Sequence, residues 1–179
     1  MLYNFKDLIK ENLNNNTFIV LHQSGSHGPS YYTKYPTNFE KFTPVCQSVE
    51  LQNCSIISLI NAYDNTILYT DNFLTKIITT LKDFTNVRFV MIYISDHGES
   101  LGEYNTYLHG LPNAIAPEVQ SQIPFLVWMS DDFIKHNKIN KDTFIKNTSY
   151  SQFNIFYSVM GAFGLKSEFY NKKLDIFNE

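Results

Sequence analysis

FVMIYISDHGES, residues 89–100, is the stretch that decides the fold of this chain. Its run of apolar, β-branched and aromatic residues predicts a buried strand. The strand ends abruptly at Asp96 and His97, and Gly98 follows. In an open α/β sheet, ligands bind just beyond the carboxyl ends of the strands, so this carboxylate and imidazole can face one metal ion. The two residue types together suit zinc or manganese.

Two further histidines lie beside glycines in predicted loops. His109 stands twelve residues beyond His97, and His27 follows another apolar run at 17–22. Glycine lets the backbone come close to a ligand. Imidazoles placed there could bind a phosphoryl oxygen or protonate a leaving group. Three histidines at strand ends beside an aspartate therefore predict a site for metal-assisted group transfer.

Asp96 and His97 alone do not complete a metal site. A catalytic zinc usually has three protein ligands and one open position. Further ligands could come from outside this chain or from four residues within it: His27, His109, Glu99 and Glu103. The sequence contains no G-x-S-x-G motif and no glycine-rich phosphate loop, and no residue pattern identifies a hydrolase nucleophile.

Composition narrows the class of protein. The chain has 179 residues, enough for one domain with a real core, and 44% of them are hydrophobic. The formal net charge is -3 and no basic run is visible, so nucleic acid is not expected as a partner. No apolar stretch reaches about 18 residues, and the first residues do not form a secretory signal. We therefore expect a single domain over residues 1–179, with no targeting segment.

The two cysteines, Cys46 and Cys54, lie eight positions apart in one polar connection. They could close a small loop as a disulfide, with a stabilisation of about 2–3 kcal/mol, or they could remain two free thiols. The spacing leaves both readings open. Disulfides persist in oxidising compartments, and a chain without an export signal could be a piece of a longer exported protein.

The patterns along the chain predict α/β order. We expect a short helix at 3–13, a strand at 17–22, a long loop at 23–53, a helix from Ser55 to Leu81 and the strand that ends at Asp96. A helical crossover implies parallel pairing, so the sheet should be mostly parallel with flanking helices. Beyond the site we expect a loop at 98–122, a strand at 123–129, a weakly patterned polar stretch at 131–149 and a closing helix at 151–163 that ends at Gly164.

Five blocks of sequence follow one another in a recognisable order. They are HQSGSHGPSYY at 22–32, FEKFTPVC at 39–46, NAYDN at 61–65, SDHGESLGE at 95–103 and YLHGLP at 107–112. Together they resemble the phosphoethanolamine transferases that modify lipid A, the family that includes the mobile colistin-resistance enzymes. The resemblance extends from about residue 17 to the C-terminus.

This resemblance implies an alkaline-phosphatase/sulfatase-like α/β/α sandwich, of which the chain would be the C-terminal part. In the family the catalytic domain faces the periplasm behind an N-terminal membrane domain. The resemblance implies zinc as the cofactor, with Asp96 and His97 as ligands. It also implies that His27 and His109 lie beside the phosphoryl group.

The implied reaction moves phosphoethanolamine from phosphatidylethanolamine to a phosphate of lipid A, lipooligosaccharide or a core sugar. It would take place at the periplasmic face of the bacterial inner membrane, through a covalent threonine intermediate, and would confer polymyxin resistance. Cys46 and Cys54 match a disulfide of the family. The nucleophilic threonine, a glutamate ligand and the membrane domain come from an upstream segment in the family, so we expect the isolated chain to be inactive. The alternatives are a sulfatase- or phosphatase-type hydrolase and a truncated, inactive remnant.

Overall fold

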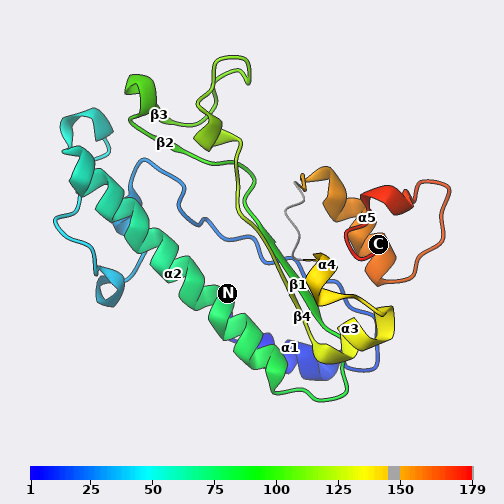
Figure 1. Ribbon diagram of the computed structural model, residues 1–179. Helices are drawn as coiled ribbons and strands as arrows, with labels where there is room; N and C mark the ends of the chain where they lie inside the picture. Colours follow the sequence, from blue (N-terminus) through cyan, green and yellow to red (C-terminus); the bar gives the residue numbers. More distant parts are fainter. Residues whose placement is uncertain (145–149, 179) are drawn as a thin grey trace. The chain divides into compact units, whose positions relative to one another are not determined.

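The computed structural model describes residues 1–144 and 150–178 (Figure 1). Its α-helices are α1 (Phe5–Glu11), α2 (Ile56–Lys82), α3 (Asp131–Asn137), α4 (Lys141–Phe144) and α5 (Phe153–Ala162). Its strands are β1 (Val90–Ile94), β2 (Ser100–Leu101), β3 (Tyr107–Leu108) and β4 (Phe125–Met129). Within these described ranges, no helix is both long enough and apolar enough to cross a membrane.

The chain forms two compact units. The first, which we call the sheet unit, comprises Met1–Ile19, Ile78–Ile94 and Pro124–Glu179. The second, which we call the loop unit, comprises Val20–Ile77 and Ser95–Ile123. All of the candidate site residues belong to the loop unit, so their geometry can be described within that unit alone.

β1 and β4 form the sheet of the sheet unit (Figure 1). They pair antiparallel, with Ile92 opposite Val127 at the centre of the register. Apolar side chains of both strands pack against a core whose buried residues are Phe133, Ile176 and Phe177. The predicted strands at 89–94 and 123–129 are therefore present, and their apolar residues help to form the core of this unit.

Two expectations about the sheet are wrong. Residues 17–22 form no strand, and β1 pairs antiparallel with β4 rather than parallel with 17–22. An apolar run becomes a strand only where a neighbour takes up its backbone N–H and C=O groups. Within the described parts of the chain, 17–22 joins no such ladder, and Phe18 and Val20 are 61% and 72% exposed. Antiparallel neighbours need no helical crossover, so β1 and β4 can be joined by loops.

α3 begins directly after β4 because Ser130 serves both elements. Its hydroxyl oxygen accepts the backbone N–H of Phe133 at 3.2 Å, while its own N–H donates to the Phe89 carbonyl at 2.9 Å. This side-chain cap satisfies one of the free N–H groups at the start of the helix. The weak patterning expected at 131–149 missed α3 and α4, and residues 145–149 lie outside the described residues.

Both predicted end helices are present, as α1 and α5. The end of α5 follows the predicted glycine stop. Gly164 has φ +64° and donates its N–H to the Gly161 carbonyl at 2.9 Å, and Leu165 N–H donates to the Met160 carbonyl at 2.9 Å. This pair of bonds is a Schellman motif, which needs a residue that tolerates positive φ.

α2 begins at the predicted cap, where Ser58 N–H donates to the hydroxyl oxygen of Ser55 at 3.2 Å. The helix packs its inner face into the core of the loop unit, whose buried residues are Tyr31, Cys46, Leu51, Leu59 and Ala62. Cys46 and Cys54 are bridged, with their Cα atoms 5.8 Å apart. That separation lies in the ordinary range for a disulfide, so the bridge is confirmed.

The predicted loop at 98–122 contains a short hairpin, in which β2 pairs antiparallel with β3. Three non-glycine residues of this hairpin have positive φ: Tyr104 at 51°, Asn105 at 59° and Leu108 at 63°. Such a conformation costs on the order of 1–3 kcal/mol for each residue and persists only where the surroundings impose it. Leu108 directly precedes His109, so the strained residue sets the direction in which that histidine leaves the hairpin.

Candidate metal centre

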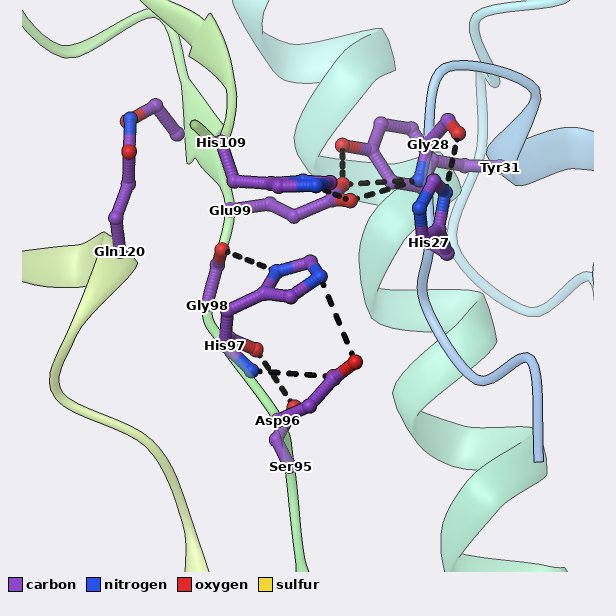
Figure 2. A network of polar contacts seen from close by, with 11 residues as sticks. His27, Gly28, Tyr31, Ser95, Asp96, His97, Gly98, Glu99, His109 and Gln120 are labelled. Carbon is purple, nitrogen blue, oxygen red and sulfur yellow. Dashed lines mark hydrogen bonds and ion pairs between the residues drawn. The ribbon is translucent and has the colours of Figure 1, made fainter. Parts of the chain in front are cut away.

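Three histidines from separate segments of the loop unit converge on one point (Figure 2). His27 comes from the loop before α2, His97 from the segment after β1, and His109 from the end of β3. One ligating atom from each ring lies within 4.8 Å of the other two. The ring centroids of His97 and His109 are 3.6 Å apart. Such a group could hold one metal ion, as the sequence predicted for these segments.

The Nδ1 atom of each of these rings lies beside an oxygen that can only accept a hydrogen bond. The pairs are His27 Nδ1 with Gly28 O at 2.7 Å, His97 Nδ1 with Gly98 O at 3.0 Å, and His109 Nδ1 with Glu99 Oε1 at 3.3 Å. A neutral imidazole that donates from Nδ1 keeps the lone pair on Nε2. Oriented in this way, imidazole is a common ligand of zinc, and a carbonyl or carboxylate behind it fixes the tautomer. The donor set therefore fits a zinc ion.

Asp96, the second predicted zinc ligand, lies on the exposed side of the same segment. Its side chain is 82% exposed, and its Oδ2 lies 3.7 Å from Nε2 of His97. Figure 2 shows this carboxylate beside the His97 ring. Among the described residues, the group whose ligating atoms approach within 4.8 Å contains His97 but not Asp96.

Glu99 lies on the opposite, buried side of that segment. Its side chain is 4% exposed. Both carboxylate oxygens accept the backbone N–H of Gly28 at 3.0 Å, Oε2 also accepts the hydroxyl of Tyr31, and Oε1 lies beside His109 (Figure 2). The sequence offered Glu99 as a possible metal ligand. The structure places it behind His109, where its oxygens already accept hydrogen bonds.

Tyr31 is 1% exposed, so it lies in the core of the loop unit. Burial and the hydrogen bond to Glu99 raise the pKa of its phenol well above the ordinary value. Its ring meets Tyr63 edge to face at a centroid distance of 5.5 Å. The phenol therefore keeps its proton to higher pH than an ordinary tyrosine and donates it to Glu99.

Two glycines allow these segments to approach closely. A Cβ on Gly98 would lie 1.9 Å from the backbone carbonyl oxygen of Val119. A Cβ on Gly28 would lie 2.5 Å from Leu108 and 2.7 Å from the Tyr31 hydroxyl. Glycine is required at Gly98 because the obstacle is backbone, whereas a side chain at Gly28 would force Leu108 and Tyr31 to shift.

Two residues that sequence reasoning missed hold the back of the site. The backbone carbonyl of Gln120 accepts the N–H of Gly98 at 3.0 Å. The side-chain amide of Gln120 donates to the hydroxyl of buried Ser100 at 2.9 Å. Neither residue type nor spacing signals this contact in the sequence. Glu103, the other candidate ligand, is exposed and accepts the N–H of Leu101 at 2.7 Å.

The fold and this site define a class of protein. The sequence profile of the sulfatase family matches residues 1–165, and the chain belongs to the sulfatase family. The expected α/β, sulfatase-like fold class is thereby confirmed.

Individual relatives show which members of the sulfatase family this chain resembles. Phosphoethanolamine transferase EptA from Helicobacter pylori is 51% identical over 164 residues, which are 91% of this chain and 30% of that protein. The chain thus spans less than a third of the length of this curated relative. The resemblance to phosphoethanolamine transferases is confirmed by this likeness.

Two solved structures share the fold of the chain. The C-terminal periplasmic domain of phosphoethanolamine transferase EptC from Campylobacter jejuni has a TM-score of 0.86 and 44% identity, and the match covers 98% of this chain and 57% of that one. The integral membrane protein lipooligosaccharide phosphoethanolamine transferase A from Neisseria meningitidis has a TM-score of 0.93 and 39% identity, over 98% of this chain and 33% of that one.

Proposed function

We propose that this chain is the C-terminal catalytic part of a zinc-dependent phosphoethanolamine transferase. The observation that carries the proposal is the convergence of His27, His97 and His109, each with Nδ1 beside a hydrogen-bond acceptor. The likeness to named phosphoethanolamine transferases supports the reaction class. The donor is phosphatidylethanolamine, and the acceptor is a phosphate of lipid A, lipooligosaccharide or a core sugar.

Asp96 and His97 hold the zinc ion in this proposal, and His27 and His109 face the phosphoryl group. The adjacency of Asp96 and His97 supports their shared role, because Oδ2 and Nε2 already lie 3.7 Å apart. Bound zinc supplies a Lewis acid that polarises a phosphoryl oxygen. His27 and His109 each offer a ring nitrogen near that of His97, from which they orient the phosphoryl group and can accept a proton.

The nucleophilic threonine and the membrane domain lie in another part of the complete protein. The chain's coverage of 30% of the Helicobacter pylori relative supports this division. The named integral membrane protein of Neisseria meningitidis, of which the chain matches 33%, supports a place at the inner membrane with the site facing the periplasm. The bridged Cys46 and Cys54 fit an oxidising compartment of that kind.

Zinc titration of the metal-free chain tests the cofactor part of this proposal. The wild-type chain should bind one zinc ion, and His97→Ala should abolish or strongly weaken binding. His136→Ala is the matched control, since His136 lies on α3 and pairs with Arg88 at 2.7 Å. Equal binding by the wild type and His97→Ala would contradict the site.

The transfer reaction is tested in the complete polypeptide that contains these residues. Mass spectrometry of lipid A from cells that express it should show added phosphoethanolamine, and His109→Ala should remove most of the signal. The chain of 179 residues expressed alone in the periplasm should add none. Transfer of the group to water alone, without modified lipid A, would favour a hydrolase of the sulfatase family. The absence of any product from the complete protein would favour an inactive remnant.

A further inference from the structure

We infer that Tyr31 and Glu99 form a buried positioning pair that fixes the tautomer of His109 and so the direction of its Nε2. Tyr31 donates its hydroxyl to Oε2 of Glu99, and Nδ1 of His109 lies 3.3 Å from Oε1 of the same carboxylate. The carboxylate is thus the middle member of a chain of three side chains, which runs from the core of the loop unit to the site (Figure 2).

The carboxylate of Glu99 is held from one side by a single short segment. Gly28 N–H donates to both oxygens at 3.0 Å, and Tyr31 donates to Oε2. Both donors are buried, so they have few other acceptors and keep the carboxylate in one orientation. Oε1 is then directed at His109, where it can accept only from an Nδ1 that carries the proton.

His109 differs from the other two histidines in how its tautomer is set. His27 and His97 each lie beside the carbonyl of the next residue, at 2.7 and 3.0 Å, so local backbone geometry is sufficient for them. The partner of His109 is ten residues away in the sequence and depends on Tyr31, sixty-eight residues from Glu99. A free imidazole in water prefers the proton on Nε2, which would block that atom as an acceptor. The buried carboxylate reverses this preference at His109.

The packing around Tyr31 gives the pair a rigid base. Its ring lies in a buried cluster with Cys46, Leu51 and Leu59, and Leu108 packs against the same cluster. Leu108 has φ +63° and directly precedes His109. Tyr31 and the residue before His109 therefore pack against one core, which supports both ends of the hydrogen-bonded chain through Glu99.

The importance of this pair for catalysis rests on the proposed function, but the tautomer itself can be measured without metal or substrate. Long-range ¹H–¹⁵N correlation spectra of the metal-free chain, with ¹⁵N-labelled histidine at a pH where imidazole is neutral, identify the protonated nitrogen of each ring. We expect His109 to carry its proton on Nδ1 in the wild type. Protonation on Nε2 in the wild type would overturn the inference without the use of any variant.

Tyr31→Phe removes only the hydroxyl and should change His109 from mostly Nδ1–H to mostly Nε2–H, while His27 and His97 keep their tautomers. Tyr35→Phe is the matched control, because Tyr35 is also buried but donates to Glu40 at 3.4 Å. An unchanged His109 in Tyr31→Phe, or the same change in both variants, would contradict the inference.

Glu99→Gln is the second variant, since it keeps the shape of the side chain and removes the charge. We expect it to shift His109 as Tyr31→Phe does, and an unshifted ring would contradict the role of the carboxylate. Zinc added to the same samples and followed at Nε2 tests the proposed function separately. If zinc fails to bind while His109 keeps its Nδ1 proton in the wild type and loses it in Tyr31→Phe, the proposed function fails and the positioning pair stands.

Discussion

The segment after β1 has two sides that differ sharply in their surroundings. Asp96 on the outer side is 82% exposed, whereas Glu99 on the inner side, three residues later, is 4% exposed. The outer side faces solvent, whereas on the inner side Glu99 accepts buried hydrogen bonds from Gly28 and Tyr31 and lies 3.3 Å from Nδ1 of His109. Two carboxylates of one short motif therefore have different surroundings, since one faces solvent and the other accepts hydrogen bonds within the protein.

The largest effect should follow from removal of the inner carboxylate. Glu99→Ala leaves the buried donors of Gly28 and Tyr31 without their acceptor, and it also removes the partner of the partly exposed His109. Each unsatisfied buried donor costs about 1–3 kcal/mol, so we expect the free energy of unfolding to fall by about 4 kcal/mol. Urea unfolding measures the change.

The control for this variant is Glu103→Ala. Glu103 is an exposed carboxylate that accepts one backbone N–H, from Leu101 at 2.7 Å. Its removal should cost no more than about 1 kcal/mol. Equal losses from the two substitutions would show that the inner carboxylate has no special role in stability.

A methyl group on the inner side should have the next largest effect. Gly98→Ala places Cβ 1.9 Å from the carbonyl oxygen of Val119, a backbone atom that cannot turn away. We expect a loss of about 3 kcal/mol in the free energy of unfolding, as for other overpacked sites. Gly110→Ala is the control, because nothing lies within 4 Å of its Cβ and only its φ of +103° resists the change. If Gly110→Ala costs as much, the close approach at Gly98 is not the cause.

The core that supports the inner side should weaken when its disulfide is removed. Cys46 lies in the same buried cluster as Tyr31, and its bridge to Cys54 closes a loop with a sequence separation of 8. Loop-closure entropy for such a loop predicts a loss of about 2.5 kcal/mol in the double variant Cys46→Ala, Cys54→Ala. Denaturant unfolding of the oxidised wild type and the variant tests this value. A loss well below about 1 kcal/mol would mean that the core holds Tyr31 without the bridge.

Some features of the site and its surroundings could be read from the sequence, and the burial of Glu99 could not. The strand at 89–94 and the cap at Ser55 follow from an apolar run and from side-chain chemistry, and the rule for strand ends indicated His97 as a site residue. The same rule indicated His27, although residues 17–22 form no strand. The burial of Glu99 could not be read in this way, because its partners Gly28 and Tyr31 are about seventy residues away in the sequence. A carboxylate in a D-H-G-E motif looks the same in sequence whether it faces a metal or a phenol.

The incorrect prediction of a strand at 17–22 has a related cause. Its apolar residues match those of 89–94, yet only the latter finds a partner, along the register from Val90 opposite Met129 to Ile94 opposite Phe125. Pairing is a long-range property, and periodicity reports only local preference. The same limit explains the wrong expectation of a parallel sheet.

The stability of the chain at alkaline pH should depend on the buried phenol of Tyr31, on the inner side. Burial and the hydrogen bond to Glu99 raise the pKa of Tyr31 above the ordinary value of 10.0. As the pH rises above 10, the unfolded chain releases the phenolic proton while the folded chain keeps it. The unfolded state then binds fewer protons, so stability falls with rising pH, with a slope for this group that approaches about 1.4 kcal/mol per pH unit well above pH 10. In Tyr31→Phe, the free energy of unfolding should depend less steeply on pH, because this contribution is absent.

Tyr170 adds a slope of its own in both proteins, because burial and Asp175 raise its pKa to about 12. The difference between the wild type and Tyr31→Phe isolates the contribution of Tyr31. Unfolding curves at several pH values between 9 and 11 give the two slopes. Parallel slopes would mean that Tyr31 ionises alike in the folded and unfolded chains.

The outer carboxylate should have the smallest effect on stability. Asp96 is 82% exposed and accepts the N–H of His97 at 3.1 Å, so Asp96→Ala should change the free energy of unfolding by no more than about 0.5 kcal/mol. Zinc affinity should nevertheless fall at least about tenfold, because loss of a direct ligand should exceed the effect of losing a supporting hydrogen bond. Asp131→Ala is the control, an exposed aspartate that pairs with Lys141 at 3.4 Å. Unchanged zinc affinity in Asp96→Ala would remove Asp96 from the metal site and leave the three histidines as the ligands. A large loss of stability would show instead that the outer side, like the inner one, holds the fold together.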